Sequence, residues 1–312
     1  MIISHKIEKI INEISKRVEP AWWPKYLFHF SDIENIINIL KTGYLYSRNK
    51  VDSKGLLKTD SASKKVIAGT LDWVLDYARL YFRPDTPNLF HVEGFCPNGI
   101  CTEKFKAHCP IPIYLVFNST KVLSIPEIRF SEGNLGSKNP GIYDNIDNFK
   151  NLPFDQIYHR GAIRNESLKR SIIHHRCAEV FLRDGLPLEN NLSFIICRSE
   201  GERETLINKI SQKLQRKYAK NIIVSRTCFL CKRQFISKVI LDKKTIEISY
   251  NSPQSCFKFE YIVELENGRK ISKIKDMPCK GFNLRFNEDK YVFKIFIDGH
   301  IAYFGEFIDY PF

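Results

Sequence analysis

The sequence predicts an α+β fold for residues 1–233 and a small β-rich domain for residues 234–312. Of the 312 residues, 43% are hydrophobic and 13% are aromatic, which is enough apolar material for a packed core. In the first part, apolar residues at helical spacing are interspersed with short apolar strands. After Gln234 the pattern changes to alternating β segments, and the dipeptides Asn267-Gly268 and Asp298-Gly299 are typical of hairpin turns.

The first predicted element is an amphipathic helix over residues 4–18. Its isoleucines recur at helical spacing, Ser4 is a suitable N-cap residue, and Pro20 ends the helix. The segment 26–30 then has the composition of a short apolar strand, interrupted by His29.

A second helix is predicted directly after this strand. Ser31 and Asp32 can cap its first turn, four apolar residues follow on one face, and Gly43 provides a C-terminal stop. Because helix N-terminal N–H groups bind anions, His29 beside this cap is a candidate contact for a pyrophosphate. A core histidine bonded to backbone is the alternative.

The later elements of the first part are separated by glycine, proline and polar residues. Residues 71–82 are apolar and aromatic and end at the break 83–87, and apolar segments predict strands at 111–117, 178–182, 193–197 and 221–224. A helix is predicted at 200–217, residues 47–70 are expected to be loop or short helix, and residues 131–153 and 158–176 are expected to be loop.

The positive charge is concentrated in the first part of the chain. The formal net charge is +13, from 48 basic and 35 acidic residues. Residues 234–312 contain 12 basic and 11 acidic residues, so 36 basic and 24 acidic residues remain for the first 233. This imbalance favours a polyanion partner for the first part alone. A composition set by genomic base bias is the alternative.

Several protein classes are excluded or disfavoured. No apolar run approaches the ~20 residues of a membrane span, and the charged N-terminus is unlike a signal peptide. Nine irregularly spaced cysteines are therefore expected to be free thiols in the cytoplasm. Cys96-x4-Cys101 near His108-Cys109, and Cys228-x2-Cys231, lack a second matching pair at standard finger spacing, so we expect no metal. The common phosphate-loop, dinucleotide and hydrolase motifs are absent.

Glu179 is the strongest candidate for chemistry. It lies in the apolar segment Cys177-Ala-Glu-Val-Phe-Leu182, where a carboxylate is costly unless it faces a cleft or a partner. A strand edge facing solvent is the alternative. The preceding segment 158–176 is rich in arginine, lysine and histidine, which could bring a polyanion close to this single acid.

Taken together, these segments resemble the DarT family of nucleic-acid ADP-ribosyltransferases over about residues 24–210. The pieces that carry the resemblance occur in the family's order along the chain. They are Leu27-Phe-His-Phe-Ser31 with Asn35, Gly43-Tyr-Leu-Tyr-Ser-Arg-Asn49, Asp76-Tyr-Ala-Arg-Leu-Tyr-Phe-Arg-Pro-Asp-Thr-Pro87, His108-Cys-Pro-Ile-Pro112, Arg129-Phe-Ser-Glu-Gly-Asn134, Leu152-Pro-Phe154, Arg176-Cys-Ala-Glu-Val180 and Cys197-Arg-Ser-Glu200. The last piece and the β-rich end resemble the longer members.

The resemblance implies an ADP-ribosyltransferase fold, with NAD as co-substrate in a cleft between two small sheets. It implies transfer of ADP-ribose to a base in single-stranded DNA by a cytoplasmic toxin, paired with a macrodomain antitoxin. Glu179 would be the catalytic glutamate, and the NAD contacts would be His29, Ser31, Arg48, Asn49 and Tyr81. The family's arginine upstream of the Tyr-Phe-x-Pro segment is missing, so Arg48, Lys64 or Lys65 would replace it. Lysine, however, lacks the planar guanidinium group with which arginine forms paired hydrogen bonds.

The chemistry fits these residue types. Cleavage of the nicotinamide–ribose bond passes through an oxocarbenium-like state that a carboxylate stabilises, and the acceptor base must be unstacked. The expected nucleic-acid contacts are basic, namely Lys64, Lys65, Arg83, Arg160, Arg164, Lys169, Arg170 and Arg176. Aspartate stands where the family has arginine after Pro84, so the base preference could differ. RNA as the substrate, a protein substrate and a non-catalytic nucleic-acid-binding module are the alternatives.

Overall fold

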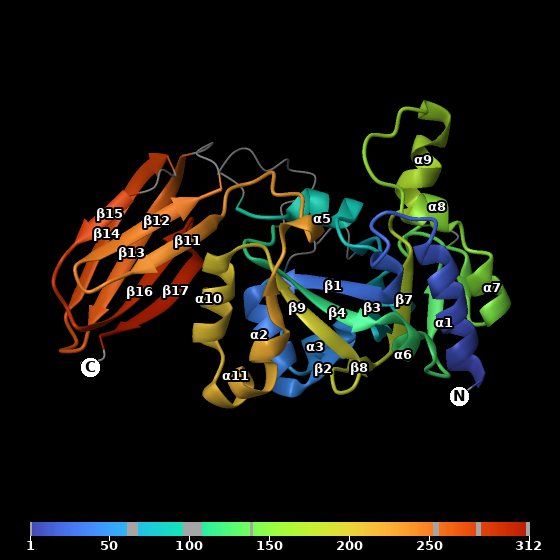
Figure 1. The fold of residues 1–312 in the computed structure, drawn as a ribbon, viewed down its shortest axis with the longest axis horizontal. Coiled ribbons are helices and arrows are strands. Elements are labelled where there is room, and N and C mark those ends of the chain that lie inside the picture. Colours follow the sequence, from blue (N-terminus) through green and yellow to red (C-terminus); the bar gives the residue numbers. More distant parts are fainter. Residues whose placement is uncertain are drawn as a thin grey trace.

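The computed structural model describes residues 2–60, 68–95, 108–137, 140–251, 256–278 and 282–309. Figure 1 shows a large sheet surrounded by helices and, on the left, a group of antiparallel strands formed by the C-terminal part of the chain. Helix α10 (Glu200–Lys209) lies between the two. The predicted combination of an α+β first part and a β-rich second part is confirmed.

The central sheet of the first part has eight strands in the order β10-β9-β4-β1-β3-β7-β5-β6. Seven residue pairs join β1 to β4, whereas Phe28↔Tyr81 is the one register pair between β1 and β3 among the described residues. The resemblance implied two small sheets; the structure has one sheet that is nearly split between β1 and β3. The strands are β1 (Tyr26–Asp32), β3 (Tyr77–Tyr81), β4 (Pro112–Asn118), β5 (Arg129–Ser131), β6 (Ile142–Tyr143), β7 (Glu179–Arg183), β9 (Leu192–Cys197) and β10 (Ile222–Val224).

A separate two-stranded sheet is formed by β2 (Tyr44–Tyr46) and β8 (Gly185–Pro187). It follows helix α2 (Ile33–Thr42), whose predicted caps are confirmed. The Asp32 side chain accepts from the Glu34 N–H, and Gly43 ends the helix at φ +73°, a conformation that glycine adopts at little cost. The first helix, α1, occupies Ile2–Ser15, close to the predicted span.

Two predictions about the later segments were wrong. Residues 158–176 are not mainly loop, because helix α9 (Glu166–His175) begins at an Asn165 cap and projects from the body of the molecule (Figure 1). Residues 200–217 form two helices, since Ser211 caps a new helix, α11 (Gln212–Tyr218). The remaining short helices are η1 (Trp23–Lys25), α3 (Arg48–Ser53), η2 (Asp72–Asp76), α5 (Pro87–Val92), α6 (Ser119–Leu123), α7 (Ile146–Lys150), α8 (Phe154–Ile157), η4 (Ala219–Asn221) and η5 (Arg226–Cys228). Within the described ranges, no helix is both long and apolar enough to cross a membrane.

The C-terminal part contains two antiparallel sheets, ordered β11-β12-β15 and β14-β13-β16-β17. Both predicted hairpin turns are present, and the glycines Gly268 and Gly299 adopt the positive φ that such turns require. A hydrophobic core of its own lies between these strands, although Phe95 from the first part also belongs to it. The strands are β11 (Ile236–Leu241), β12 (Thr245–Tyr250), β13 (Cys256–Leu265), β14 (Lys270–Pro278), β15 (Phe282–Arg285), β16 (Lys290–Ile297) and β17 (His300–Ile308). The exact boundary at residue 234 stays a prediction.

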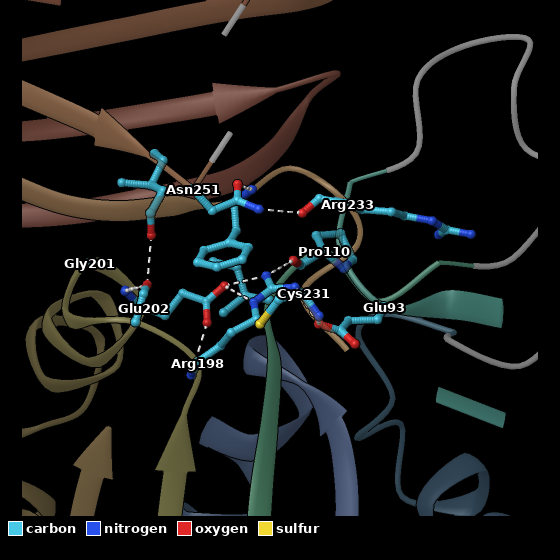
Figure 2. A network of polar contacts seen from close by, with 12 residues as sticks. Glu93, Pro110, Arg198, Gly201, Glu202, Cys231, Arg233 and Asn251 are labelled. Carbon is cyan, nitrogen blue, oxygen red and sulfur yellow. Dashed lines mark hydrogen bonds and ion pairs between the residues drawn. The ribbon is translucent and has the colours of Figure 1, made fainter. Parts of the chain in front are cut away.

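A buried ion network centred on Arg198 lies where the two parts meet (Figure 2). The Arg198 guanidinium pairs with Glu202 and, at 3.2 Å, with Glu93, and it also donates to the carbonyl oxygen of Pro110. Glu93 in turn accepts from the backbone N–H groups of Leu230 and Cys231 at 2.8 and 3.0 Å. The network thereby joins the segment that leads into the C-terminal part to the end of β9 and the start of α10.

Candidate active site

A pocket of about 200 Å³ opens beside the near-split of the central sheet. Its lining combines apolar side chains with a few polar groups, and it comes from β1, α2, β2, α3, β3 and their connections. The residues are His29, Ser31, Asn35, Asn38, Ile39, Thr42, Tyr44, Leu45, Tyr46, Arg48, Val51, Leu56, Leu57, Tyr77 and Arg79.

His29 presents a neutral imidazole to this pocket. Its Nδ1 lies 3.0 Å from the backbone carbonyl oxygen of Arg79. A carbonyl oxygen only accepts, so the hydrogen bond assigns the proton to Nδ1 and leaves Nε2 as an acceptor. Burial lowers the pKa of His29 to about 4, and the adjacent Arg79 guanidinium acts in the same direction. The ring is therefore uncharged at neutral pH and can accept a hydrogen bond from a ligand hydroxyl.

Glu179 and Arg79 form a two-pronged ion pair at the inner end of the pocket. Arg79 Nε lies 2.5 Å from Oε2 of Glu179, and Nη2 lies 2.7 Å from Oε1. Glu179 is fully buried, whereas about 30% of the Arg79 side chain is exposed and lines the pocket. Burial alone would lower the pKa of Arg79, but the carboxylate of Glu179 outweighs it and the pKa is raised. Arg79 is therefore charged at neutral pH.

The strand register explains how these two side chains meet. Tyr81 on β3 pairs with Glu179 on β7, which places Arg79 diagonally across from Glu179. Long side chains in such diagonal positions are within reach of each other on one face of a sheet. Since the backbone of Arg79 also holds His29, the imidazole and the carboxylate belong to one site. His29 lines the pocket, whereas Glu179 is buried behind Arg79 and is not a lining residue, so their expected common cleft stays a prediction.

A short loop closes the far side of Glu179. The N–H of Leu135 lies 3.4 Å from Oε1, and the N–H of Glu179 donates to Oγ of Ser131. Helix α9 packs against this loop, because a Cβ atom added at Gly133 would fall within 2.3 Å of the His174 ring. Glu179 is thus held between Arg79 on the pocket side and the loop on the other.

Ser31 and Asn35 form a polar corner of the pocket at the start of α2. Asn35 Nδ2 donates to Oγ of Ser31 at 3.1 Å and to the Thr59 carbonyl oxygen at 2.7 Å. Its Oδ1 accepts from the N–H groups of Lys58 and Thr59. One amide side chain therefore fixes the segment before residue 60 against the strand that carries His29.

Three other predicted NAD contacts are placed differently. Arg48 lines the pocket, but its guanidinium binds Asp52 at 2.7 Å and Asp60 at 2.9 Å. Arg79, rather than Arg48, binds Glu179, and the expected catalytic role of Arg48 stays a prediction. Asn49 donates to Asp76 and is not among the lining residues. Tyr81 stacks on Phe30 and accepts from Asn88, also outside the lining.

Sequence reasoning missed Arg79. The signal was present in the alternation of β3, where Ala78 and Leu80 are buried and Tyr77, Arg79 and Tyr81 point to the other face. A single arginine on one face of an otherwise apolar strand needs a buried acid or a ligand. The cross-strand register that supplies Glu179 cannot be read from local pattern alone.

The predicted nucleic-acid contacts divide into three groups. Arg160, Arg164, Lys169 and Arg170 are exposed on and before α9, where Lys169 pairs with Glu166. Arg176 is partly buried and donates to the Gly161 carbonyl oxygen. Lys64 and Lys65 lie outside the described residues.

The prediction for Arg83 was wrong. Its guanidinium is buried, binds Asp85 and donates to the carbonyl oxygens of Ile157 and His159. All of these partners are internal, so Arg83 cannot contact a phosphate in this structure.

The cysteine motifs do not form a metal cluster in the described part of the chain. Cys96 and Cys101 lie outside that part. The Cys228-x2-Cys231 turn is bound through its backbone by the Glu93 carboxylate. Across the described ranges, no group of three or more His, Cys, Asp or Glu side chains could hold a metal ion.

Comparison with known proteins identifies related chains. The family model "ssDNA thymidine ADP-ribosyltransferase, DarT" matches residues 28–229. The solved structure of Thermus sp. 2.9 DarT in complex with ADP-ribosylated ssDNA is similar in fold, with a TM-score of 0.51, 15% identity, and coverage of 66% of this chain and 96% of that chain. The structure of the same protein in complex with NAD+ has a TM-score of 0.49 and 15% identity, and the match covers 66% of this chain and 98% of that chain. A search of curated proteins finds no match.

Proposed function

Because the chain belongs to the DarT family of ssDNA thymidine ADP-ribosyltransferases, which use NAD, we propose that Arg79 and Glu179 are its catalytic pair. We further propose that NAD binds in the pocket lined by His29, Ser31 and Asn35. The observation that carries this proposal is the two-pronged pair between a pocket-lining arginine and a fully buried carboxylate, joined through the Arg79 backbone to the neutral His29.

The polar groups of the pocket suit a dinucleotide. The free Nε2 of His29 can accept a hydrogen bond from a ribose hydroxyl. The hydroxyl of Ser31 and the cationic Arg79 line the same pocket. Apolar lining residues such as Ile39 and Leu45 can contact the flat ring systems of NAD.

Glu179 would act on the ribose carbon from which nicotinamide leaves. As the C–N bond breaks, its electron pair goes to nicotinamide and positive charge develops on the ribose, which a carboxylate stabilises. Arg79 now stands between the pocket and Glu179. We infer that the diphosphate of NAD draws some of the N–H donors of Arg79 toward itself, which frees a carboxylate oxygen for the ribose.

The acceptor would be the ring nitrogen N3 of thymine. In DNA this is the one thymine ring nitrogen that carries a proton, so a new bond from N3 to the ribose carbon releases that proton. Glu179 is the group we propose to accept it. N3 is paired inside a duplex, so an unpaired base is the suitable substrate.

The proposed function is tested by mass analysis of defined oligonucleotides after incubation with NAD. We expect single-stranded DNA that contains thymine to gain one ADP-ribose per modified base and to release one nicotinamide. The same oligonucleotide without thymine, or paired with its complement, is the matched control. Modification of RNA alone, of protein alone, or of no polymer would contradict the proposal and support the corresponding alternative.

We propose that the exposed basic residues on and before α9 bind the phosphates of the DNA backbone. Removing the charge of Arg160, Arg164, Lys169 and Arg170 together is expected to weaken binding of single-stranded DNA. Because each phosphate contact releases counterions, the slope of log Kd against log salt should become shallower by up to ~3, at ~0.7 per contact.

This slope is measured by titrating a labelled oligonucleotide at several salt concentrations. Removing four exposed lysines from the C-terminal part, Lys238, Lys258, Lys273 and Lys275, is the matched control and should leave the slope unchanged. A wild-type slope in the α9 variant would show that DNA does not follow this surface.

The biological setting follows from the proposed chemistry. An ADP-ribose on N3 of thymine removes the hydrogen bond that N3–H donates to adenine and so blocks copying of the strand. We therefore propose that the chain is a cytoplasmic toxin, in a toxin–antitoxin or anti-phage system, whose antitoxin partner is a macrodomain hydrolase that removes the modification. We also propose residues 1–233 as the transferase domain and residues 234–312 as an accessory domain.

A further inference from the structure

Two tyrosines form an exposed stack at the rim of the pocket. Tyr44 and Tyr46 lie on β2 with ring centroids 5.4 Å apart and an angle of 6° between the ring planes. Both line the pocket, yet Tyr44 is 43% exposed. The buried residue between them, Leu45, belongs to the core. The stack therefore stands on a rigid strand and shows one ring to solvent.

The local backbone supports the stack. Positions 44 and 46 lie on one side of β2 because side chains alternate along a strand. Tyr46 pairs with Gly185 on β8, and a Cβ atom at Gly185 would lie 3.0 Å from Cδ1 of Tyr46. The ring is thus packed against a glycine backbone. Lys54 places its Nζ 5.5 Å from the centre of the Tyr46 ring, so a cation accompanies the aromatic pair.

We propose that Tyr44 and Tyr46 stack on a base of the single-stranded DNA that flanks the modified thymine, and that Lys54 meets the adjoining phosphate. This inference rests on the proposed function. The acceptor thymine must reach the ribose beside Arg79, so its neighbours in the strand have to leave the pocket across the rim. There they lack stacking partners, and aromatic side chains with nearby cations are the usual substitute.

The other planar group that could use this stack is the adenine of NAD. The exposure of Tyr44 argues for DNA, because a ring that lines the pocket and is 43% exposed is accessible to a strand that leaves the pocket. In addition, no residue from 158–176 lines the pocket in the described structure, so the α9 surface does not supply a contact for bases at this rim.

The test is the affinity of the full chain for a labelled thymine-containing oligonucleotide without NAD. We expect Tyr44→Ala to raise Kd about tenfold, since base stacking on an aromatic side chain contributes on the order of 1–3 kcal/mol. Tyr44→Phe keeps the ring and should stay within about twofold of wild type. Lys54→Gln should reduce the salt slope by about 0.7 for the single phosphate contact, whereas Tyr44→Ala should leave the slope unchanged.

Phe90→Ala is the matched control. Phe90 is 48% exposed and lies beneath Lys232 Nζ at 4.1 Å, but it sits on α5, far from β2 in Figure 1 and outside the pocket lining. Its loss should not change Kd. An unchanged Kd for Tyr44→Ala would overturn the proposal.

A rise in KM for NAD together with an unchanged oligonucleotide Kd would also overturn it, by assigning the stack to adenine. ADP-ribose transfer by the wild-type chain is measured separately. If the wild-type chain transfers no ADP-ribose, the proposed function is refuted. The Kd values of the tyrosine variants still test whether Tyr44 and Tyr46 stack on DNA.

Discussion

Glu179→Gln is expected to abolish ADP-ribose transfer, with kcat lowered at least about 100- to 1000-fold. Glutamine preserves the shape of the side chain but removes the negative charge that would face the developing positive charge on the ribose. Loss of one preorganised electrostatic group in an active site typically has an effect of this size. The measurement is the rate of labelled ADP-ribose transfer from NAD to a single-stranded oligonucleotide.

Two further variants distinguish a loss of catalysis from a loss of folded structure. Arg79→Lys keeps a positive charge next to Glu179 but loses the two-pronged geometry, so we expect an intermediate fall in rate. Glu189→Gln removes an exposed carboxylate on the loop between β8 and β9 and should leave the rate unchanged. The Glu179→Gln variant should stay folded and bind NAD with wild-type affinity, although loss of the buried carboxylate beside Arg79 lowers its unfolding midpoint, so rates are compared well below that midpoint. If that variant still transferred ADP-ribose at the wild-type rate, Glu179 would not be the catalytic group.

Arg198→Ala is expected to lower the free energy of unfolding by about 3–5 kcal/mol. Arg198 is fully buried, and its removal leaves the buried carboxylates of Glu93 and Glu202 without their cation (Figure 2). The aromatic contact of the guanidinium with the Phe235 ring, 4.1 Å from its centroid, is lost as well. The measurement is the urea unfolding midpoint followed by fluorescence and circular dichroism.

An exposed pair on the same helix provides the control. Arg203 binds Glu200 at 3.6 Å, and both side chains are exposed, so Arg203→Ala should change stability by no more than about 1 kcal/mol. Burial raises the pKa of the Glu202 carboxyl, so the defect of Arg198→Ala should shrink as pH falls and protonation of Glu202 removes one uncompensated charge. A defect that is small, or equal at all pH values, would show that the network does not stabilise the chain through its charges.

Local patterns were sufficient for much of the fold. The helix after the first strand follows from the cap at Asp32 and the stop at Gly43, and both hairpins of the C-terminal part follow from their Asn-Gly and Asp-Gly turns. These features depend on residues within a few positions of one another, so the sequence displays them directly. Helix α9 was missed because it is short and largely exposed, and so lacks a clear apolar stripe.

The site was only partly predictable, because its contacts join residues that are far apart in the sequence. His29 and Glu179 stood out as polar groups in apolar segments, and the structure brings them to one site through Arg79. Arg79 and Arg83 are both arginines within five residues of one another, and the sequence does not reveal which one faces the pocket. In the structure Arg79 lines it, whereas Arg83 is buried against Asp85.

Local features of the chain predict the α+β class, the β-rich C-terminal part, and Glu179 and His29 as candidate site residues. Composition, caps, turns and the cost of a charge in an apolar segment carry that information locally. Strand pairing and packing in the folded chain establish that Arg79 binds Glu179, that Tyr44 and Tyr46 line the pocket, and that Arg198 contacts Phe235 of the C-terminal part. Those contacts depend on strand register and on packing between residues as many as 105 positions apart. Such contacts form only when several segments pair and pack together, so no single segment of the sequence displays them.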